Sequence, residues 1–179
     1  MSQHKHVVRL QDVPVDRINA PEGSSFGGLR QRVGAYLGAE KLGYSFYRIP
    51  PGKAAFPYHT HSRNEELIYI IAGEGVLRFG AEEIPVTSET VIACPTGSEY
   101  AHQLINTGGK DLRYLVVSTM SYPDLCEYPD SNKLGAYETA AVGQKVGIRA
   151  LYLKDKTLNY YDGEDGKEIA RITKASPKG

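Results

Sequence analysis

The sequence lacks an excess of charge of either sign and lacks any apolar run long enough to cross a bilayer. Its 21 basic residues balance 21 acidic residues, so net charge gives no reason to expect nucleic acid or an anionic membrane as a partner. A membrane-spanning helix needs roughly 18 or more apolar residues, and the first residues also lack the apolar core of a signal peptide. We therefore expect a cytoplasmic protein that binds neither nucleic acid nor membrane.

Cysteine is scarce and tryptophan is missing. Cys94 and Cys126 are the two cysteines, and in a chain without an export signal we expect both to stay reduced. Cys94 precedes a proline at the end of an apolar run, so we favour a buried thiol that packs as a small hydrophobe over a residue of a functional pocket. The 13 tyrosines are the aromatic rings available to stack on a sugar, but half-buried packing is their commoner role.

Short apolar runs separated by turn residues dominate the chain. Turn-forming sequences rich in glycine, proline and asparagine lie at residues 50–52, 80–82 and 106–109. Strands that recur about every eight to twelve residues are typical of an all-β sandwich or barrel. The predicted strands are 7–10, 42–49, 66–72, 76–79, 83–86, 90–94, 112–118, 149–153 and 158–161, with another that carries His102.

A length of 179 residues suits one domain with a sizeable core. We expect residues 42–120 to form the barrel core. Residues 1–41 are predicted to form an N-terminal extension with a loop that packs on the barrel, and residues 121–179 a C-terminal extension that wraps it.

Three of the five histidines lie inside the strand-rich region, and two of these three are neighbours in one extended segment. His59 and His61 are two residues apart, so in a strand their side chains share a face. A carboxylate follows at Glu65 or Glu66, and only one of the two can face inward. Periodicity does not say which row faces the interior, but we favour Glu66, which forms one row with Ile68 and Ile70.

The third histidine follows a proline-glycine turn. His102 begins a short apolar stretch after Pro95 and Gly97. Three neutral imidazoles and one carboxylate are a suitable ligand set for a divalent transition metal, and they leave open positions for a substrate. The remaining histidines, His4 and His6, lie near the amino terminus, where we expect them to be solvated.

Two motifs contain these residues: His59-x-His61-x4-Glu66-x6-Gly73, and Pro95-x-Gly97 followed by His102-x3-Asn106. They resemble the two signature motifs of the cupin superfamily. The resemblance covers roughly residues 43–119, with a weaker echo at residues 128–130. Within that superfamily, the sequence is similar to a bacterial single-domain subgroup whose members are sometimes labelled sugar-phosphate isomerases.

The resemblance implies an all-β cupin-type double-stranded β-helix, a jelly-roll barrel, with N- and C-terminal extensions. It also implies that His59, His61, Glu66 and His102 hold one divalent metal, Mn, Fe, Ni or Zn, and it supports Glu66 over Glu65. The chain departs from the motifs at Glu89, where a glycine is usual. Two extra residues also separate Gly97 from His102, and six residues rather than five separate Gly52 from His59.

A metal-dependent enzyme that acts on a small molecule is the function we favour, either an oxygenase or an isomerase. The alternatives are a cupin that only binds or senses a small molecule or sugar, and one whose metal only braces the barrel. The sequence identifies no catalytic base, and we expect Arg48 and Arg78 to point outward. Exposed sheet edges and the resemblance together predict a homodimer.

Overall fold

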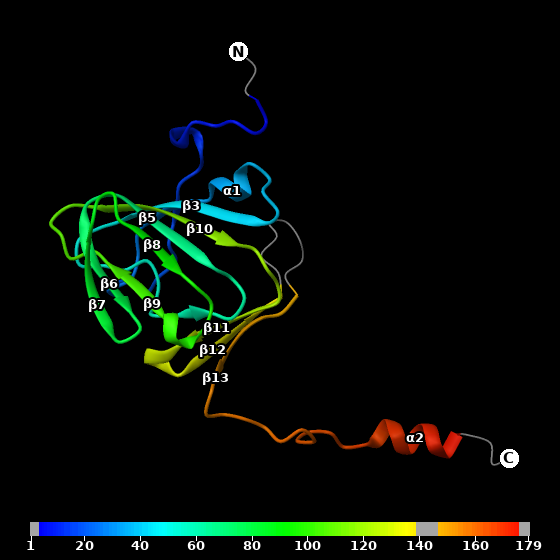
Figure 1. Ribbon diagram of the computed structural model, residues 1–179. Coiled ribbons are helices and arrows are strands. Elements are labelled where there is room, and N and C mark those ends of the chain that lie inside the picture. The colour runs from blue at the N-terminus through cyan, green and yellow to red at the C-terminus, as the bar shows by residue number, and fades with distance from the viewer. Residues whose placement is uncertain (1–3, 139–146, 176–179) are drawn as a thin grey trace.

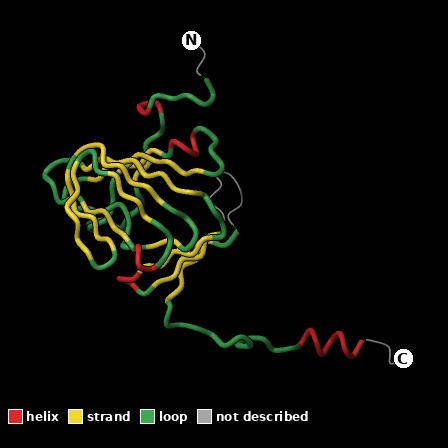
Figure 2. Tube along the Cα trace, in the orientation of Figure 1, coloured by secondary structure: helices red, strands yellow, loops and turns green. Residues whose placement is uncertain are grey.

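The computed structural model describes residues 4–138 and 147–175 of the chain. Within these ranges strands are the main regular structure, and they are joined by loops and a few short helices (Figure 2). The strands are β1 (Asp16–Arg17), β2 (Leu29–Gln31), β3 (Leu42–Ile49), β4 (Thr60–His61), β5 (Glu66–Ala72), β6 (Glu74–Phe79), β7 (Glu82–Thr87), β8 (Val91–Cys94), β9 (His102–Ile105), β10 (Leu112–Thr119), β11 (Asp124–Tyr128), β12 (Lys133–Tyr137) and β13 (Arg149–Leu153). The helices are η1 (Leu10–Asp12), α1 (Val33–Tyr36), η2 (Ser98–Tyr100), η3 (Pro129–Ser131) and α2 (Lys167–Ala175).

The strands form three antiparallel sheets. Their orders are β1-β2-β3-β10-β5-β8, β13-β12-β11-β4 and β7-β6-β9. The sheets curve around one interior, with β3, β10, β5 and β8 on one side and β6, β7 and β9 facing them (Figure 1). This arrangement confirms the predicted all-β double-stranded β-helix. The N-terminal strands β1 and β2 extend the first sheet, whereas β11, β12 and β13 form a separate sheet with β4.

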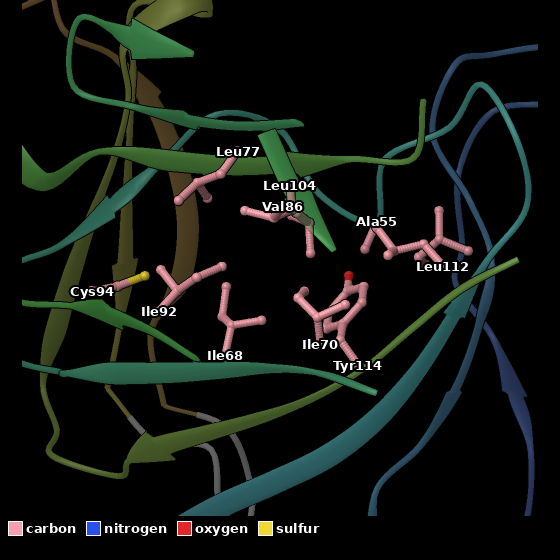
Figure 3. Packing of buried hydrophobic residues seen from close by; sticks show 11 residues of the cluster. Ala55, Ile68, Ile70, Leu77, Val86, Ile92, Cys94, Leu104, Leu112 and Tyr114 are labelled. Atoms are coloured by element: carbon pink, nitrogen blue, oxygen red, sulfur yellow. The ribbon is translucent and has the colours of Figure 1, made fainter. Parts of the chain in front are cut away.

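Alternate residues of the central strands build the core. Ile68 and Ile70 of β5 are buried, while Glu65 and Leu67 in the opposite row are exposed. Ile70 lies opposite Tyr114 of β10 in the strand register, and both side chains point into the same cluster (Figure 3). Each large apolar side chain buried in this way stabilises the fold by roughly 1.5–3 kcal/mol.

The side chain of Asn106 fixes the turn in which it lies through three hydrogen bonds to the backbone. Asn106 is fully buried, and its amide donates hydrogen bonds to the carbonyl oxygens of Ile49 at 2.7 Å and Lys110 at 2.9 Å. Its own carbonyl accepts from the Gly108 backbone at 2.9 Å. These bonds satisfy backbone groups that would otherwise be buried without partners.

The turn between β7 and β8 explains why the cupin motif usually has a glycine there. Glu89 has a φ of +69°, in the left-handed region that favours glycine. The chain therefore keeps the turn geometry of the motif with a glutamate in a strained conformation. At Gly73 the glycine is required for space as well, since a Cβ there would lie 2.8 Å from the carbonyl oxygen of Asp111.

Two predicted strands are wrong. Residues 7–9 are irregular and Leu10 begins η1, while residues 158–161 run into a turn, because no strand among the described residues pairs with either segment. The helix α2 near the C-terminal end was not predicted. No helix among residues 4–138 and 147–175 is long and apolar enough to cross a membrane.

Candidate metal centre

The structure brings the four predicted side chains together from different sheets. His59 and His102 form an isolated backbone bridge, with reciprocal N–H to carbonyl bonds of 3.1 and 2.7 Å. This bridge joins the segment before β4 to the start of β9. The imidazole rings of His59 and His102 are 4.8 Å apart, and those of His59 and His61 are 5.2 Å apart.

Glu66 lies among the three rings. Its Oε2 is 3.2 Å from Nε2 of His102, and its Oε1 is 3.9 Å from Nε2 of His61. Ligand atoms of His59, His61 and Glu66 all lie within 4.8 Å of one another, a spacing that suits a shared cation. All four side chains are buried or partly buried, so they form a site shielded from bulk solvent.

Each imidazole is oriented by an acceptor on its Nδ1 side. Nδ1 of His59 donates to the carbonyl oxygen of Pro57 at 2.9 Å, and Nδ1 of His102 donates to that of Tyr100 at 3.1 Å. Nδ1 of His61 donates to a carboxylate oxygen of Asp124 at 2.6 Å. Because these oxygens only accept, Nδ1 carries the proton and Nε2 is left as the ligand atom. The donor set therefore fits a divalent transition metal.

Asp124 is the most heavily bonded acceptor near the site. It is 2% exposed and also accepts from the side chain of Asn64 at 2.8 Å, the Arg63 backbone at 2.9 Å and the Ser62 hydroxyl at 3.2 Å. Burial raises the pKa of this carboxyl, but the hydrogen bonds from His61 and Asn64 outweigh it and lower the pKa to about 2. Asp124 is thus ionised, and its carboxylate holds the imidazole of His61 in place.

Two further residues of β11 face the same site. Sγ of Cys126 lies 3.2 Å from Nδ1 of His61, and the ring of Tyr128 stacks on His59 at 6.1 Å. His61, Asp124 and Cys126 form a second group of ligand atoms. However, burial and then Asp124 raise the pKa of the Cys126 thiol, which keeps it neutral and a poor ligand. The sequence did not lead us to predict the row Asp124, Cys126 and Tyr128, although these residues are spaced two apart in the chain.

The pKa values of His59 and His102 are shifted in opposite directions. Burial, followed by the nearby His102, lowers the pKa of His59 to about 4. Burial also acts to lower the pKa of His102, but Cys94 and Glu66 raise it to about 10. Nε2 of His102 thus holds a proton toward Glu66, and a divalent ion held by His102 would have to replace that proton. Cys94 is buried in the core as predicted, and it also lies beside a site residue.

The two arginines considered from the sequence point away from the core, as predicted. Arg48 is exposed, 3.8 Å from Asp111. Arg78 makes two hydrogen bonds to Asp130, at 2.8 and 3.0 Å, and its strand neighbour Leu77 fills the core instead. Neither arginine contacts the four-residue site.

A groove of about 600 Å³ lies elsewhere on the molecule. It is bounded by residues 17–23 and 26–29 of the N-terminal extension and by Arg48, Lys53 and Asp111, and none of the four predicted residues lines it. We assign the functional site to the histidine cluster, because convergent ligand atoms rather than open volume determine where a metal binds.

Comparison with known proteins identifies the family of the fold. The family profile of the Cupin domain matches residues 45–118. The chain is 36% identical over 116 residues to the oxalate-binding protein of Thermotoga maritima, an alignment that covers 62% of this chain and 91% of that protein.

Solved structures share the fold. A sugar phosphate isomerase of the cupin superfamily from Silicibacter pomeroyi superposes with a TM-score of 0.73 at 21% identity, over 87% of this chain and 98% of that one. A predicted oxalate decarboxylase from Thermotoga maritima superposes with a TM-score of 0.54 at 26% identity, over 63% and 97%. With the fold, the motifs and a 36% identical relative in agreement, the chain belongs to the cupin superfamily.

Proposed function

We propose that this cupin binds one divalent transition metal per chain through His59, His61, Glu66 and His102, and that the metal site holds a small oxygen-rich ligand. The observation that carries the proposal is the protonation pattern of the imidazoles. Each has an acceptor on Nδ1, which makes Nε2 the ligand atom, and at His102 the metal would replace the proton that Nε2 holds toward Glu66. One carboxylate and three neutral imidazoles leave a divalent ion with net positive charge, which favours an anionic ligand.

A bound Mn, Fe, Ni or Zn ion supplies Lewis acidity toward carbonyl and carboxylate oxygens. The chain itself contributes orientation and exclusion of water. The carbonyl oxygens of Pro57 and Tyr100 and the carboxylate of Asp124 hold the three rings, while Tyr128 covers His59. An isomerase or an oxygenase that acts on a small molecule is the enzyme class we favour.

Non-catalytic binding of a small carboxylate is the second candidate. The 36% identical relative is an oxalate-binding protein. In addition, the hydroxyl of Tyr128 near the site is bonded to that of Tyr137 at 2.9 Å, and burial raises its pKa, so this hydroxyl is not a ready base. Oxygen consumption or product formation with chelating substrates would favour the enzyme, and tight oxalate binding without turnover would favour the binding protein.

Metal content tests the proposal directly. Purified without a tag and without chelators, the protein is expected to carry close to one first-row transition metal ion per chain by elemental analysis. Stripping the ion and adding back Mn, Fe, Ni or Zn should restore the same stoichiometry. A preparation that is metal-free and takes up none of these ions would contradict the proposal.

A homodimer is also part of the proposal. Beyond β13, residues 154–173 are exposed throughout, including Leu158 at 81%, Tyr160 at 89% and Ile169 at 71%. Figure 1 shows this segment leaving the barrel and ending in α2. A nine-residue helix is marginal by itself in water, so an exposed arm that carries several large apolar side chains is best explained by packing on a second copy.

Removal of the arm should change the oligomeric state. We expect the full chain to be dimeric and a chain that stops at Leu153 to be monomeric, as measured by light scattering during size exclusion. The substitutions Leu158→Ser and Tyr160→Ser should weaken the dimer in the full chain without changing metal content. A full chain that is already monomeric at micromolar concentration would contradict the dimer.

A further inference from the structure

Arg30 on β2 is a cation that makes no ion pair within the part of the chain that the structure describes. Its Nε is buried and has no hydrogen-bond partner, and no carboxylate within residues 4–138 and 147–175 forms an ion pair with it. The cation–ring contacts among the described residues are made by Arg78, Lys133 and Arg149 and not by Arg30. A partly buried guanidinium with fixed donors usually has a charged partner, because the loss of hydration is costly.

The register places Arg30 in the row that lines the barrel interior. Arg30 lies opposite Tyr47 of β3, and Tyr47 lies opposite Tyr114 of β10, a core residue. Directly paired residues of adjacent strands project from the same face. The side chain of Arg30 therefore points inward, whereas Arg48 on the next strand points outward.

Tyr47 connects Arg30 to the four-residue site. Burial raises the pKa of Tyr47, a hydrogen bond and the charge of Arg30 counter this rise, and the charge of Glu66 adds to it. The hydroxyl of Tyr47 thus lies within electrostatic reach of both charged groups. Its ring is 5.7 Å from that of Phe56, which in turn is 6.4 Å from His59. Tyr114 pairs with Ile70 of β5, and Glu66 lies in the same alternating row of β5 as Ile70, so Arg30 and Glu66 project from one face of the first sheet.

We propose that Arg30, together with the hydroxyl of Tyr47, binds an oxyanion group of the ligand whose other end lies at His59, His61, Glu66 and His102. The ligand is then a small carboxylate or phosphate compound, since a planar guanidinium matches both groups with two parallel hydrogen bonds. This inference rests on the proposed function for the metal end of the ligand. It identifies Arg30 as the residue that selects anionic ligands.

The test compares Arg30→Gln with a matched control, Arg48→Gln. Oxalate and inorganic phosphate are titrated separately into the metal-loaded full chain by calorimetry, so that carboxylate and phosphate recognition are distinguished. Arg30→Gln is expected to weaken binding of the preferred anion by about 10–100-fold with no change in metal content. Arg48→Gln should bind as the wild type does, and Arg30→Lys should lie between the two.

Thermal unfolding gives a second readout. Without an added anion, Arg30→Gln should unfold at the same temperature as the wild type or higher, because it removes a partly buried cation whose Nε has no hydrogen-bond partner among the described residues. It should also lose the stabilisation that the anion gives to the wild type. A lower unfolding temperature with an unchanged anion response would make Arg30 a structural residue and overturn the inference.

The outcomes for metal and anion are separable. Equal anion affinity in the wild type and Arg30→Gln, or no binding of either anion to the metal-loaded wild type, overturns the role of Arg30 while the metal site stands. A chain that takes up no metal defeats the proposed function. In that case the same titrations on metal-free protein still decide on Arg30, since its contact with the anion does not pass through the metal.

Discussion

Replacing His102 by alanine is expected to abolish stoichiometric metal binding. The ring is 4% exposed, its Nε2 faces Glu66 at 3.2 Å and its backbone pairs with that of His59. The substitution removes one of the four proposed ligands, and no other imidazole among the described residues lies close enough to replace it. Affinity for Mn, Fe, Ni or Zn should fall by more than the 10–100-fold typical of residues that only support a ligand.

The measurement is metal content by elemental analysis, followed by titration of the stripped protein. His59→Ala should behave in the same way, because its ring meets both other histidines. His4→Ala is the control, since His4 is exposed near the amino terminus and its ring contacts only His6 among the described residues. If His102→Ala kept one ion per chain with unchanged affinity, the ligand set proposed here would be wrong.

Removing the carboxylate of Asp124 should have the largest effect on stability. Asp124→Ala leaves four donors without their acceptor in a buried position, namely those of Ser62, Arg63, Asn64 and His61. Loss of one partner from such a buried network costs about 3–5 kcal/mol. We therefore expect the free energy of unfolding of the metal-free protein, measured in urea, to fall by this amount.

Asp124→Asn separates the structural role from the role in metal binding. An amide nitrogen facing His61 would donate to Nδ1, which moves the imidazole proton to Nε2 and removes its ligand lone pair. Metal affinity should fall about 10–100-fold, also when the Asp124→Asn variant is fully folded. As a control, Asp130→Asn removes an exposed carboxylate paired with Arg78 and should cost less than about 1 kcal/mol. Unchanged metal affinity in Asp124→Asn would limit Asp124 to a structural role.

Local sequence was sufficient to predict the central strands. The bounds of β3 and β5 agree with the predicted strands 42–49 and 66–72, because alternation of apolar residues and flanking turn residues are short-range signals. The same alternation placed Ile68 and Ile70 in one row. Segments 7–10 and 158–161 have strand-like composition as well, but a strand also needs a partner, and their local sequence says nothing about one.

The gap between Gly97 and His102 shows how a tertiary contact can absorb a change in spacing. The two extra residues lie where the short helix η2 forms, and His102 still pairs with His59. At Glu89 the backbone keeps a left-handed φ of +69° without a glycine. In both places the packed barrel maintains the arrangement although the motif has changed.

The sequence by itself determined the class of fold and the four residues proposed as ligands, since both depend on spacing within a strand and on recognisable turns. Only the tertiary structure decided which groups support them. Asp124 meets His61 because β11 pairs with β4, a contact between residues more than 60 positions apart in the chain. Arg30 faces the interior because β2 pairs with β3. Pairing between distant strands depends on the whole packed core, and for that reason local periodicity does not determine it.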